Sequence, residues 1–127
     1  MAEKLKLMVV DDERDNLDLL YRTFRREFKV FRADGAFRAL EILEAEGEMA
    51  IIISDQSMPE MSGLQLLGKT SETFPDTVRI LLTGYSEDAL DGAADNIFQC
   101  ISKPWHPEEL KAVMREAAER YKSAKGS

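Results

Sequence analysis

In the stretch Leu7-Met8-Val9-Val10-Asp11-Asp12, four apolar residues run directly into two carboxylates. Three further apolar runs also end at a polar side chain: Ile51-Ile52-Ile53-Ser54 before Asp55, Ile80-Leu81-Leu82 before Thr83, and Ile101-Ser102 before Lys103. Short, nearly continuous apolar runs are typical of strands buried on both faces of a parallel sheet. The carboxyl ends of such strands meet at one edge, where ligands bind. The sequence therefore predicts one acidic pocket that also holds a lysine and a hydroxyl: Asp11, Asp12, Asp55, Thr83 and Lys103.

Helical periodicity fills the segments between these runs. In the first segment apolar residues recur at helical spacing, at Leu17, Leu20, Tyr21, Phe24 and Phe28. Further helices are predicted over 36–46, from Ser62-Gly63 to a point before Pro75, from Ser86 across Gly92, and from Pro107 to about Tyr121. The segment 29–33 is predicted to be an edge strand. Strands that alternate with helices predict an α/β domain with helices on both faces of the sheet.

Length and charge narrow the class of protein. A chain of 127 residues forms one domain, and its net charge of -7 argues against a nucleic-acid-binding surface. The basic cluster Arg22, Arg25 and Arg26 is interpreted as a solvated helix face. No apolar stretch approaches the roughly 18 residues of a membrane span, and no signal-peptide pattern precedes the first strand. With a single cysteine, Cys100, the sequence favours a cytoplasmic protein without membrane contact.

Three carboxylates in one pocket repel one another. At a separation of about 4 Å and an effective dielectric constant near 20, each pair costs roughly 4 kcal/mol. Either a shared proton or a hard cation must neutralise the site, and an all-oxygen ligand set with several waters is typical of Mg²⁺. A carboxylate can also attack phosphorus, and a metal, an ammonium and a hydroxyl would then stabilise the phosphoryl oxygens. The alternative is that Asp11 or Asp12 caps the first helix and that Asp55 is a loop residue.

Four separated motifs resemble, in order and spacing, the receiver domain of bacterial two-component response regulators: Val9-Val10-Asp11-Asp12-Glu13, Asp55-Gln56-Ser57-Met58-Pro59-Glu60-Met61-Ser62-Gly63, Leu82-Thr83-Gly84-Tyr85 and Ser102-Lys103-Pro104-Trp105. The resemblance extends from Leu5 to about Tyr121. It implies a flavodoxin-like receiver fold with a doubly wound five-stranded parallel sheet in the order 2-1-3-4-5. We accordingly assign residues 1–122 to the receiver domain and 123–127 to a tail, which is either the start of a linker or a cloning remnant.

The resemblance also implies a role for each residue that would contact phosphate. Asp55 is implied as the phosphoacceptor, supplied by a histidine kinase or a phosphotransfer protein. Lys103 would pair with the phosphoryl group, and Thr83 would supply the hydroxyl that moves toward it on activation. The Lys103-Pro104 bond is expected to be cis, as in many members of the family.

The implied metal is Mg²⁺. Its ligands would be Asp11 and Asp12, one directly and one through water, together with Asp55 and the backbone carbonyl of Ser57. The protein would be a signalling domain rather than an enzyme, limited to Mg-assisted self-phosphorylation and slow self-dephosphorylation.

The implied output is a conformational change on one surface, formed by the helix from Ser86, the strand that ends at Ser102 and the helix from Pro107. The resemblance leaves two further partners open: a second copy bound through this surface, and an output domain outside this chain.

Three departures from the family pattern affect the expected switch. Cys100 occupies the position, three residues before Lys103, where most relatives have an aromatic side chain. The segment from Thr83 to Lys103 is also a few residues shorter, and Tyr85 is bulky enough to lie across the acyl phosphate. Because side chains two apart in a strand share a face, Phe98 and Cys100 are predicted on the same face, so that Phe98 or Tyr85 fills the space of the missing aromatic.

Three other classes of protein fit the sequence less well. An aspartyl phosphatase needs a second acid two residues after its nucleophile, where this chain has Ser57. A flavodoxin-like electron carrier binds a flavin phosphate in its first loop, and Asp11 and Asp12 would repel that anion. A receiver-like adaptor that acts without phosphorylation is the remaining alternative. Such an adaptor normally lacks one of the acidic, acceptor or lysine positions, all of which are present here.

Overall fold

The computed structural model describes residues 4–84 and 97–126, and its central layer is a parallel sheet. The strands are β1 (Leu5–Val10), β2 (Phe28–Ala33), β3 (Ile51–Asp55), β4 (Val78–Thr83) and β5 (Gln99–Ser102). The described helices are α1 (Arg14–Phe24), α2 (Ala36–Glu46), α3 (Gly63–Thr73) and α4 (Pro107–Gly126). The strand order β2-β1-β3-β4-β5 confirms the predicted doubly wound sheet, with β2 at an edge. Among these helices none has the length and apolar character needed to cross a membrane.

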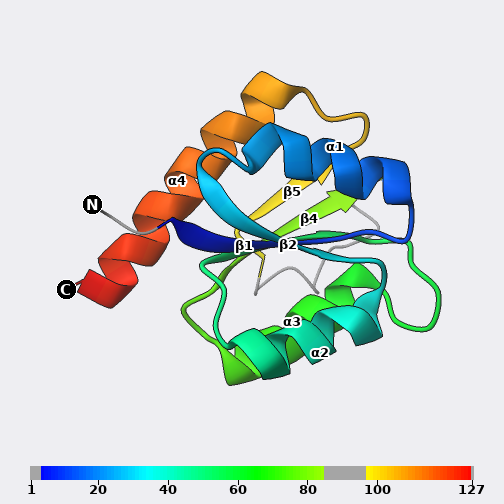
Figure 1. Cartoon of the computed structure of the whole chain (residues 1–127), viewed down its shortest axis with the longest axis horizontal. Coiled ribbons are helices and arrows are strands. Elements are labelled where there is room, and N and C mark those ends of the chain that lie inside the picture. Colours follow the sequence, from blue (N-terminus) through cyan, green and yellow to red (C-terminus); the bar gives the residue numbers. More distant parts are fainter. Residues whose placement is uncertain (1–3, 85–96, 127) are drawn as a thin grey trace.

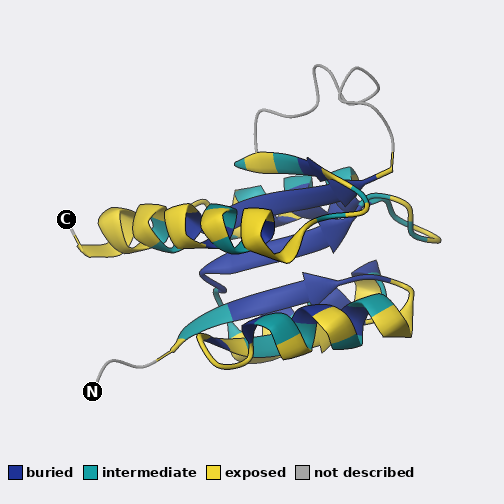
Figure 2. Ribbon diagram, turned by 90° about the horizontal axis from the view of Figure 1, so that it is seen from above, coloured by how far each residue is buried: buried dark blue, intermediate teal, exposed yellow. Residues whose placement is uncertain are grey.

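Helices cover both faces of the sheet, α1 and α4 on one side and α2 and α3 on the other (Figure 1). Side chains of β1 alternate between two apolar cores: Leu7 and Val9 pack toward α1 and α4, whereas Met8 and Val10 pack toward α2 and α3. The central strands are buried throughout most of their length (Figure 2). Burial on both faces explains why these strands read as nearly continuous apolar runs in the sequence.

The strand register aligns the carboxyl ends of neighbouring strands. The paired residues at this edge are Val10 with Ser54, Asp55 with Leu82, and Thr83 with Ser102. The residues that follow these pairs therefore leave the sheet side by side.

The first predicted helix ends earlier than its apolar periodicity suggested. Helix α1 stops at Phe24, and Phe28 is the first residue of β2 rather than a fifth member of the helical stripe. The chain turns between them, with the Glu27 amide donating to the Phe24 carbonyl at 3.1 Å. The two phenyl rings then meet edge to face, with centroids 6.1 Å apart. Both rings pack in the same apolar core. The helical spacing of apolar residues therefore continued from α1 to the first residue of β2.

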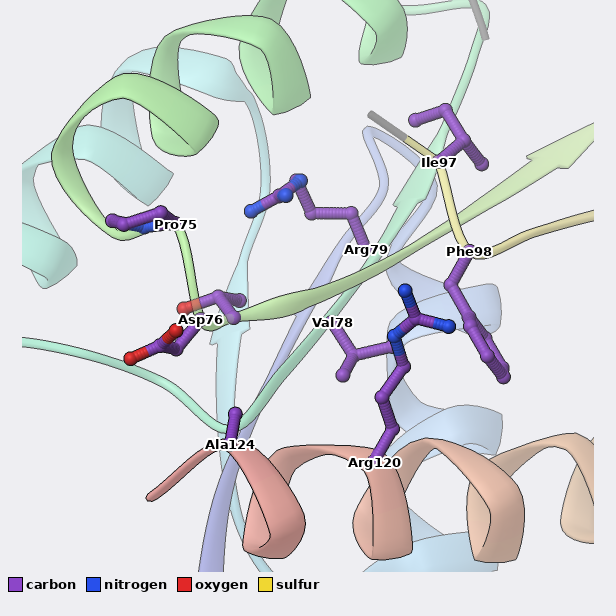
Figure 3. Close-up of a pocket in the computed structure, with 9 residues that line it drawn as sticks. Pro75, Asp76, Val78, Arg79, Ile97, Phe98, Arg120 and Ala124 are labelled. Carbon is purple, nitrogen blue, oxygen red and sulfur yellow. The ribbon is translucent and has the colours of Figure 1, made fainter. Parts of the chain in front are cut away.

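The prediction that Phe98 and Cys100 share a face is wrong. Strand β5 begins at Gln99, so the alternation of a strand does not extend back to Phe98. Phe98 packs against the core that lies beneath α4, and Cys100 packs against the opposite core. The Phe98 ring lies 5.4 Å from the Arg120 guanidinium, beside a cavity of ≈ 290 Å³ at the amino end of β4 (Figure 3). The predicted helix from Ser86 and the position of Tyr85 fall outside the described residues.

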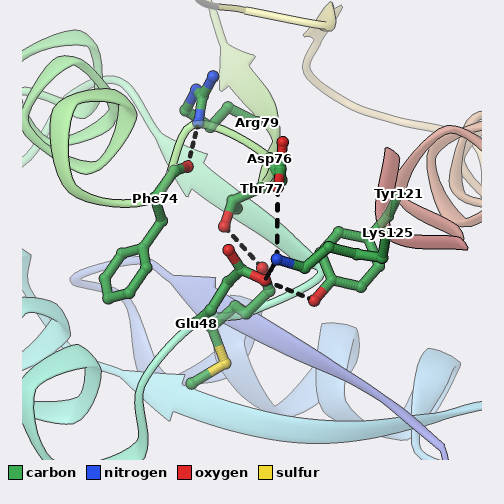
Figure 4. Close-up of polar contacts among 8 residues, drawn as sticks. Glu48, Phe74, Asp76, Thr77, Arg79, Tyr121 and Lys125 are labelled. Atoms are coloured by element: carbon green, nitrogen blue, oxygen red, sulfur yellow. Dashed lines mark hydrogen bonds and ion pairs between the residues drawn. The ribbon is translucent and has the colours of Figure 1, made fainter. Parts of the chain in front are cut away.

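The last helix is longer than the sequence predicted, because α4 continues to Gly126 and does not end at about Tyr121. Lys125 Nζ lies 3.0 Å from Glu48 Oε1 and 3.3 Å from Asp76 Oδ2. The Tyr121 hydroxyl donates to the same Glu48 oxygen at 2.6 Å (Figure 4). These contacts fasten the last turns of α4 to the loops that precede β3 and β4, and they stabilise the helix beyond the predicted limit.

The hydrogen bond from Tyr121 to Glu48 predicts a specific pH dependence. Burial, the hydrogen bond and the Glu48 charge raise the pKa of Tyr121 to about 12. Because the neutral phenol is the donor, its contribution is complete below the unfolded pKa near 10 and is lost as pH rises toward about 12. Tyr121→Phe should lower the free energy of unfolding at pH 7 by about 1 kcal/mol and flatten this alkaline loss. Urea denaturation at several pH values measures both effects.

The matched control is Tyr21→Phe, since the Tyr21 hydroxyl has no hydrogen-bond partner within residues 4–84 and 97–126. Equal losses of stability in the two variants at pH 7 would show that the Glu48 contact contributes nothing.

Candidate functional site

Three carboxylates meet at the carboxyl edge of the sheet. Asp11 and Asp12 follow β1, and Asp55 is the last residue of β3. One carboxylate oxygen from each lies within 4.8 Å of the others. Asp11 is 1% exposed and Asp55 5%, whereas Asp12 is open to solvent. The structure thus brings together the acidic residues that the sequence placed at one edge.

Lys103 supplies positive charge to this pocket. Its ammonium forms an ion pair with Asp55 Oδ1 and lies 3.9 Å from Asp11 Oδ2. Burial acts to lower the pKa of Lys103, but the hydrogen bond and charge of Asp55, with the charge of Asp11, outweigh it, so that the pKa is raised. Lys103 therefore stays charged at neutral pH. The Lys103-Pro104 bond is cis, as expected.

Asp11 has one oxygen that no donor satisfies. Its Oδ1 accepts a hydrogen bond from the Glu13 amide at 2.9 Å, but its buried Oδ2 has no hydrogen-bond partner among the described residues. Burial, with a further contribution from the Asp55 charge, raises the pKa of Asp11, although the Glu13 hydrogen bond opposes this. A buried carboxylate oxygen without a donor is costly. This oxygen faces the pocket, where a proton or a cation would remove that cost.

The alternative that Asp11 or Asp12 caps the first helix does not describe this geometry. The N-cap residue of α1 is Glu13, and no side chain makes a capping hydrogen bond there. The Asp11 side chain instead bonds to the loop amide of Glu13 itself. The two aspartates are therefore free of a capping role in α1.

The loop after Asp55 is held to α3 by a residue to which sequence reasoning gave no role. The Gln56 side-chain oxygen accepts from the Leu64 amide at 2.9 Å, and the Gln56 carbonyl accepts from the Gly63 amide at 3.0 Å. The backbone N–H of Gln56 in turn donates to the Leu82 carbonyl at 2.9 Å. No periodicity or motif could reveal this clamp, because it depends on where α3 returns to the sheet.

Gly63 permits that close return. A Cβ atom at this position would overlap the backbone oxygen of Asp55 and lie 2.8 Å from the Leu81 side chain. Ser62 caps α3, and Gln65 completes a capping box, so the helix begins at a fixed point beside β3. The backbone of Asp55 is therefore positioned by packing as well as by the strand.

The remaining predicted site residues lie on neighbouring segments. Thr83 is the buried last residue of β4, and its carbonyl accepts from the Lys103 amide at 2.8 Å. This bond joins the two segments that carry the predicted hydroxyl and ammonium. Ser57 is exposed, two residues beyond Asp55 in the loop.

The fold agrees with what comparison with known proteins shows. The sequence-family model of the response regulator receiver domain matches residues 7–115 of the chain. The chain belongs to the receiver-domain family of response regulators. Receiver domains are signalling modules of two-component systems, which agrees with the resemblance in the sequence motifs.

Curated relatives of this receiver domain are longer than the chain. The hydrogenase transcriptional regulatory protein HoxA of Bradyrhizobium diazoefficiens is 38% identical over 122 residues, which are 94% of this chain and 25% of HoxA. Response regulator Rre1 of Synechocystis is 32% identical, and the match covers 98% of this chain and 56% of Rre1. The chain thus spans about a quarter to a half of the length of these relatives.

Solved structures that resemble the chain include members of the same family. The receiver domain of an HD domain-containing protein from Pseudomonas fluorescens superposes with a TM-score of 0.90 at 30% identity, covering 99% of this chain and 95% of the other. The response regulator TrrA of Thermotoga maritima, solved in complex with Mg²⁺-BeF, gives a TM-score of 0.81 at 28% identity, covering 91% and 99%.

The unsatisfied oxygen of Asp11 predicts a gain of stability on removing its charge. Asp11→Asn keeps the acceptor for the Glu13 amide and should raise the free energy of unfolding in metal-free buffer at pH 7 by about 1 kcal/mol or more. Because the pKa of Asp11 is raised in the folded state, the wild type should lose stability relative to the variant as pH increases through that pKa. Thermal denaturation in excess chelator measures the difference.

Asp12→Asn is the matched control, because Asp12 is exposed and should respond much less. A lower melting temperature for Asp11→Asn than for the wild type would show that the Asp11 charge stabilises the empty pocket.

Proposed function

We propose that this receiver domain accepts a phosphoryl group on Asp55 from the phosphohistidine of a histidine kinase or a phosphotransfer protein. The observation that carries the proposal is the buried Asp55 carboxylate at a strand end, paired with Lys103 and within 4.8 Å of two further carboxylates. A carboxylate held in place beside an ammonium is arranged as a nucleophile toward phosphorus.

The reaction is a direct displacement at phosphorus. A carboxylate oxygen of Asp55 forms the new P–O bond as the P–N bond to the donor histidine breaks, and the departing imidazole takes up a proton. The Lys103 ammonium stabilises the charge on the phosphoryl oxygens and holds the acyl phosphate near the sheet edge. The Thr83 hydroxyl, at the end of the adjacent strand, is the group proposed to approach the phosphoryl oxygens.

The residues in the pocket fit a divalent cation. Asp11, Asp12 and Asp55 supply oxygen ligands, and the backbone carbonyl of Ser57 is proposed as a fourth. The buried, unsatisfied Asp11 Oδ2 is an oxygen that such an ion would satisfy. When bound, Mg²⁺ would neutralise the carboxylates and the phosphoryl oxygens. The complex of TrrA with Mg²⁺-BeF supports this assignment.

The proposed output is a change in the surface made by β5, the start of α4 and the segment from Ser86, which lies outside the described residues. The longer relatives support an output domain joined to this module, and a second copy bound through the same surface is the alternative partner. We place the reaction in the cytoplasm, where histidine kinases expose their phosphohistidine. The chain is proposed to have no catalytic role beyond its own phosphorylation and slow dephosphorylation.

Incubation with a small acyl phosphate tests the acceptor directly. The wild type should gain one phosphoryl group when Mg²⁺ is present and none in excess chelator, because the three carboxylates otherwise repel the incoming anion. Asp55→Asn should gain none. Intact-protein mass spectrometry measures the adduct, and peptide mapping places it.

Asp76→Asn is the matched control, since Asp76 is a carboxylate at the opposite edge of the sheet and should leave labelling unchanged. A phosphoryl adduct on Asp55→Asn would reject the acceptor. An unlabelled wild type would favour the adaptor that acts without phosphorylation.

Switching through Thr83 is tested with a beryllofluoride mimic of the phosphoryl group. Amide chemical shifts of β5 and of the first turn of α4 should change in the wild type and should change much less in Thr83→Ala, because the hydroxyl links the acyl phosphate to the adjacent strand. Thr77→Ala, at the other end of β4, is the control. If the shifts in β5 survive the loss of the Thr83 hydroxyl, the output surface is coupled through another residue.

A further inference from the structure

A cavity lined by cations opens at the amino edge of the sheet, opposite the edge that carries Asp55. It lies among the starts of β1 and β2 and the end of α1, and its volume is ≈ 560 Å³. The cationic lining residues are Lys4, Lys6, Arg25 and Lys29, and none of the described residues that line it is acidic. The remaining wall includes the ring of Tyr21. This concentration of positive charge occurs in a chain whose net charge is -7.

None of these four cations has a carboxylate partner within residues 4–84 and 97–126. Lys4 Nζ donates to the Arg25 carbonyl at 3.1 Å, and Lys6 Nζ donates to the Glu46 carbonyl at 2.7 Å. Lys29 Nζ lies 5.5 Å from the centre of the Phe31 ring. Carbonyls and rings are neutral, so these contacts orient the ammonium groups without cancelling their charge.

The carbonyl ends of helices explain the position of only two of the four cations. The carbonyl ends of α1 and α2 attract cations, which explains the hydrogen bonds of Lys4 and Lys6. Lys29 lies on β2 at no helix end, and the Arg25 guanidinium has no hydrogen-bond or ion-pair partner in the described part of the chain. By contrast, Arg32 on the same strand pairs with Asp18 at 2.8 Å. Arg25 and Lys29 are therefore available to a ligand.

We propose that this cavity binds a small polyanion that carries two or more phosphate groups. Its volume is in the range of small-molecule sites, about 300 to 1,000 Å³. A guanidinium and several ammonium groups are the side chains that recognise phosphate oxygens. The site lies apart from Asp55 and does not depend on its phosphorylation.

The neighbouring surface carries charge of both signs. A second hollow shares Lys4 and Phe28 with this cavity, and it is lined by Glu27 and Glu119 as well as by Arg115 and Lys122. Positive charge without carboxylates among the described lining residues is confined to the first cavity, which favours a compact ligand over an extended acidic peptide.

Isothermal titration calorimetry with inorganic tripolyphosphate, in metal-free buffer at low salt, tests the proposal. The wild type should bind one equivalent saturably, and Arg25→Gln/Lys29→Gln should bind at least tenfold more weakly. Arg38→Gln/Lys69→Gln makes the same change in net charge on α2 and α3, and it should bind as the wild type does. Asp55→Asn should also bind normally, which separates this site from the proposed phosphoacceptor.

Amide chemical shifts locate the ligand in the same samples. Tripolyphosphate should shift the amides of residues 4–6, 25 and 29 and leave those of Asp55 and Lys103 unchanged. No saturable binding to the wild type would overturn the proposal, as would equal binding to both double variants. Saturable binding of a hexaglutamate peptide where tripolyphosphate does not bind would also overturn it, in favour of an acidic protein partner.

Discussion

The balance between three carboxylates and the Lys103 ammonium at one sheet edge is the electrostatic constraint that shapes the candidate site. The parallel register sets Asp11 and Asp55 beside each other, and their burial makes each uncompensated charge costly. Lys103 offsets part of this cost through its ion pair with Asp55. Asp11 Oδ2 has no hydrogen-bond partner among the described residues, and the Lys103 ammonium lies 3.9 Å from it. The proposed cation would lower the cost that remains.

Much of the scaffold serves to hold this edge in position. Gln56 and Gly63 join the loop after β3 to the start of α3, so that Asp55 cannot move independently of the helix. The backbone bond between Thr83 and Lys103 joins the ends of β4 and β5 in the same way. A fixed position suits the role proposed for Asp55, because phosphoryl transfer depends chiefly on positioning and on charge stabilisation.

The sequence predicted those parts of the fold that depend on one element at a time. The apolar runs identified β1, β3 and β4 because burial on both faces leaves no polar alternation, and the limits of α2 were predicted from its apolar spacing and from Gly47. The errors at Phe28, at Phe98 and at the end of α4 all concern where an element begins or ends. The turn before β2 and the start of β5 do not show in the apolar spacing, and the last turns of α4 are held by a contact between distant segments, from Lys125 to Glu48. The meeting of the three aspartates with Lys103 was predictable because strand ends in a parallel sheet converge, and their roles stay predictions. The Gln56 clamp and the Asp11 oxygen that has no hydrogen-bond partner among the described residues depend on contacts that only the folded chain shows.

A crystal structure of the chain with Mg²⁺ and beryllofluoride would show directly whether Asp55 is the phosphoacceptor and whether the acidic pocket holds the metal. We expect the beryllium atom on a carboxylate oxygen of Asp55, with its fluorines in contact with Lys103 Nζ and the Thr83 hydroxyl. We expect the metal ion to be bound to Asp11 and to Asp12, directly or through water. Beryllofluoride on another residue, or a metal-free acidic pocket at saturating Mg²⁺, would contradict these expectations.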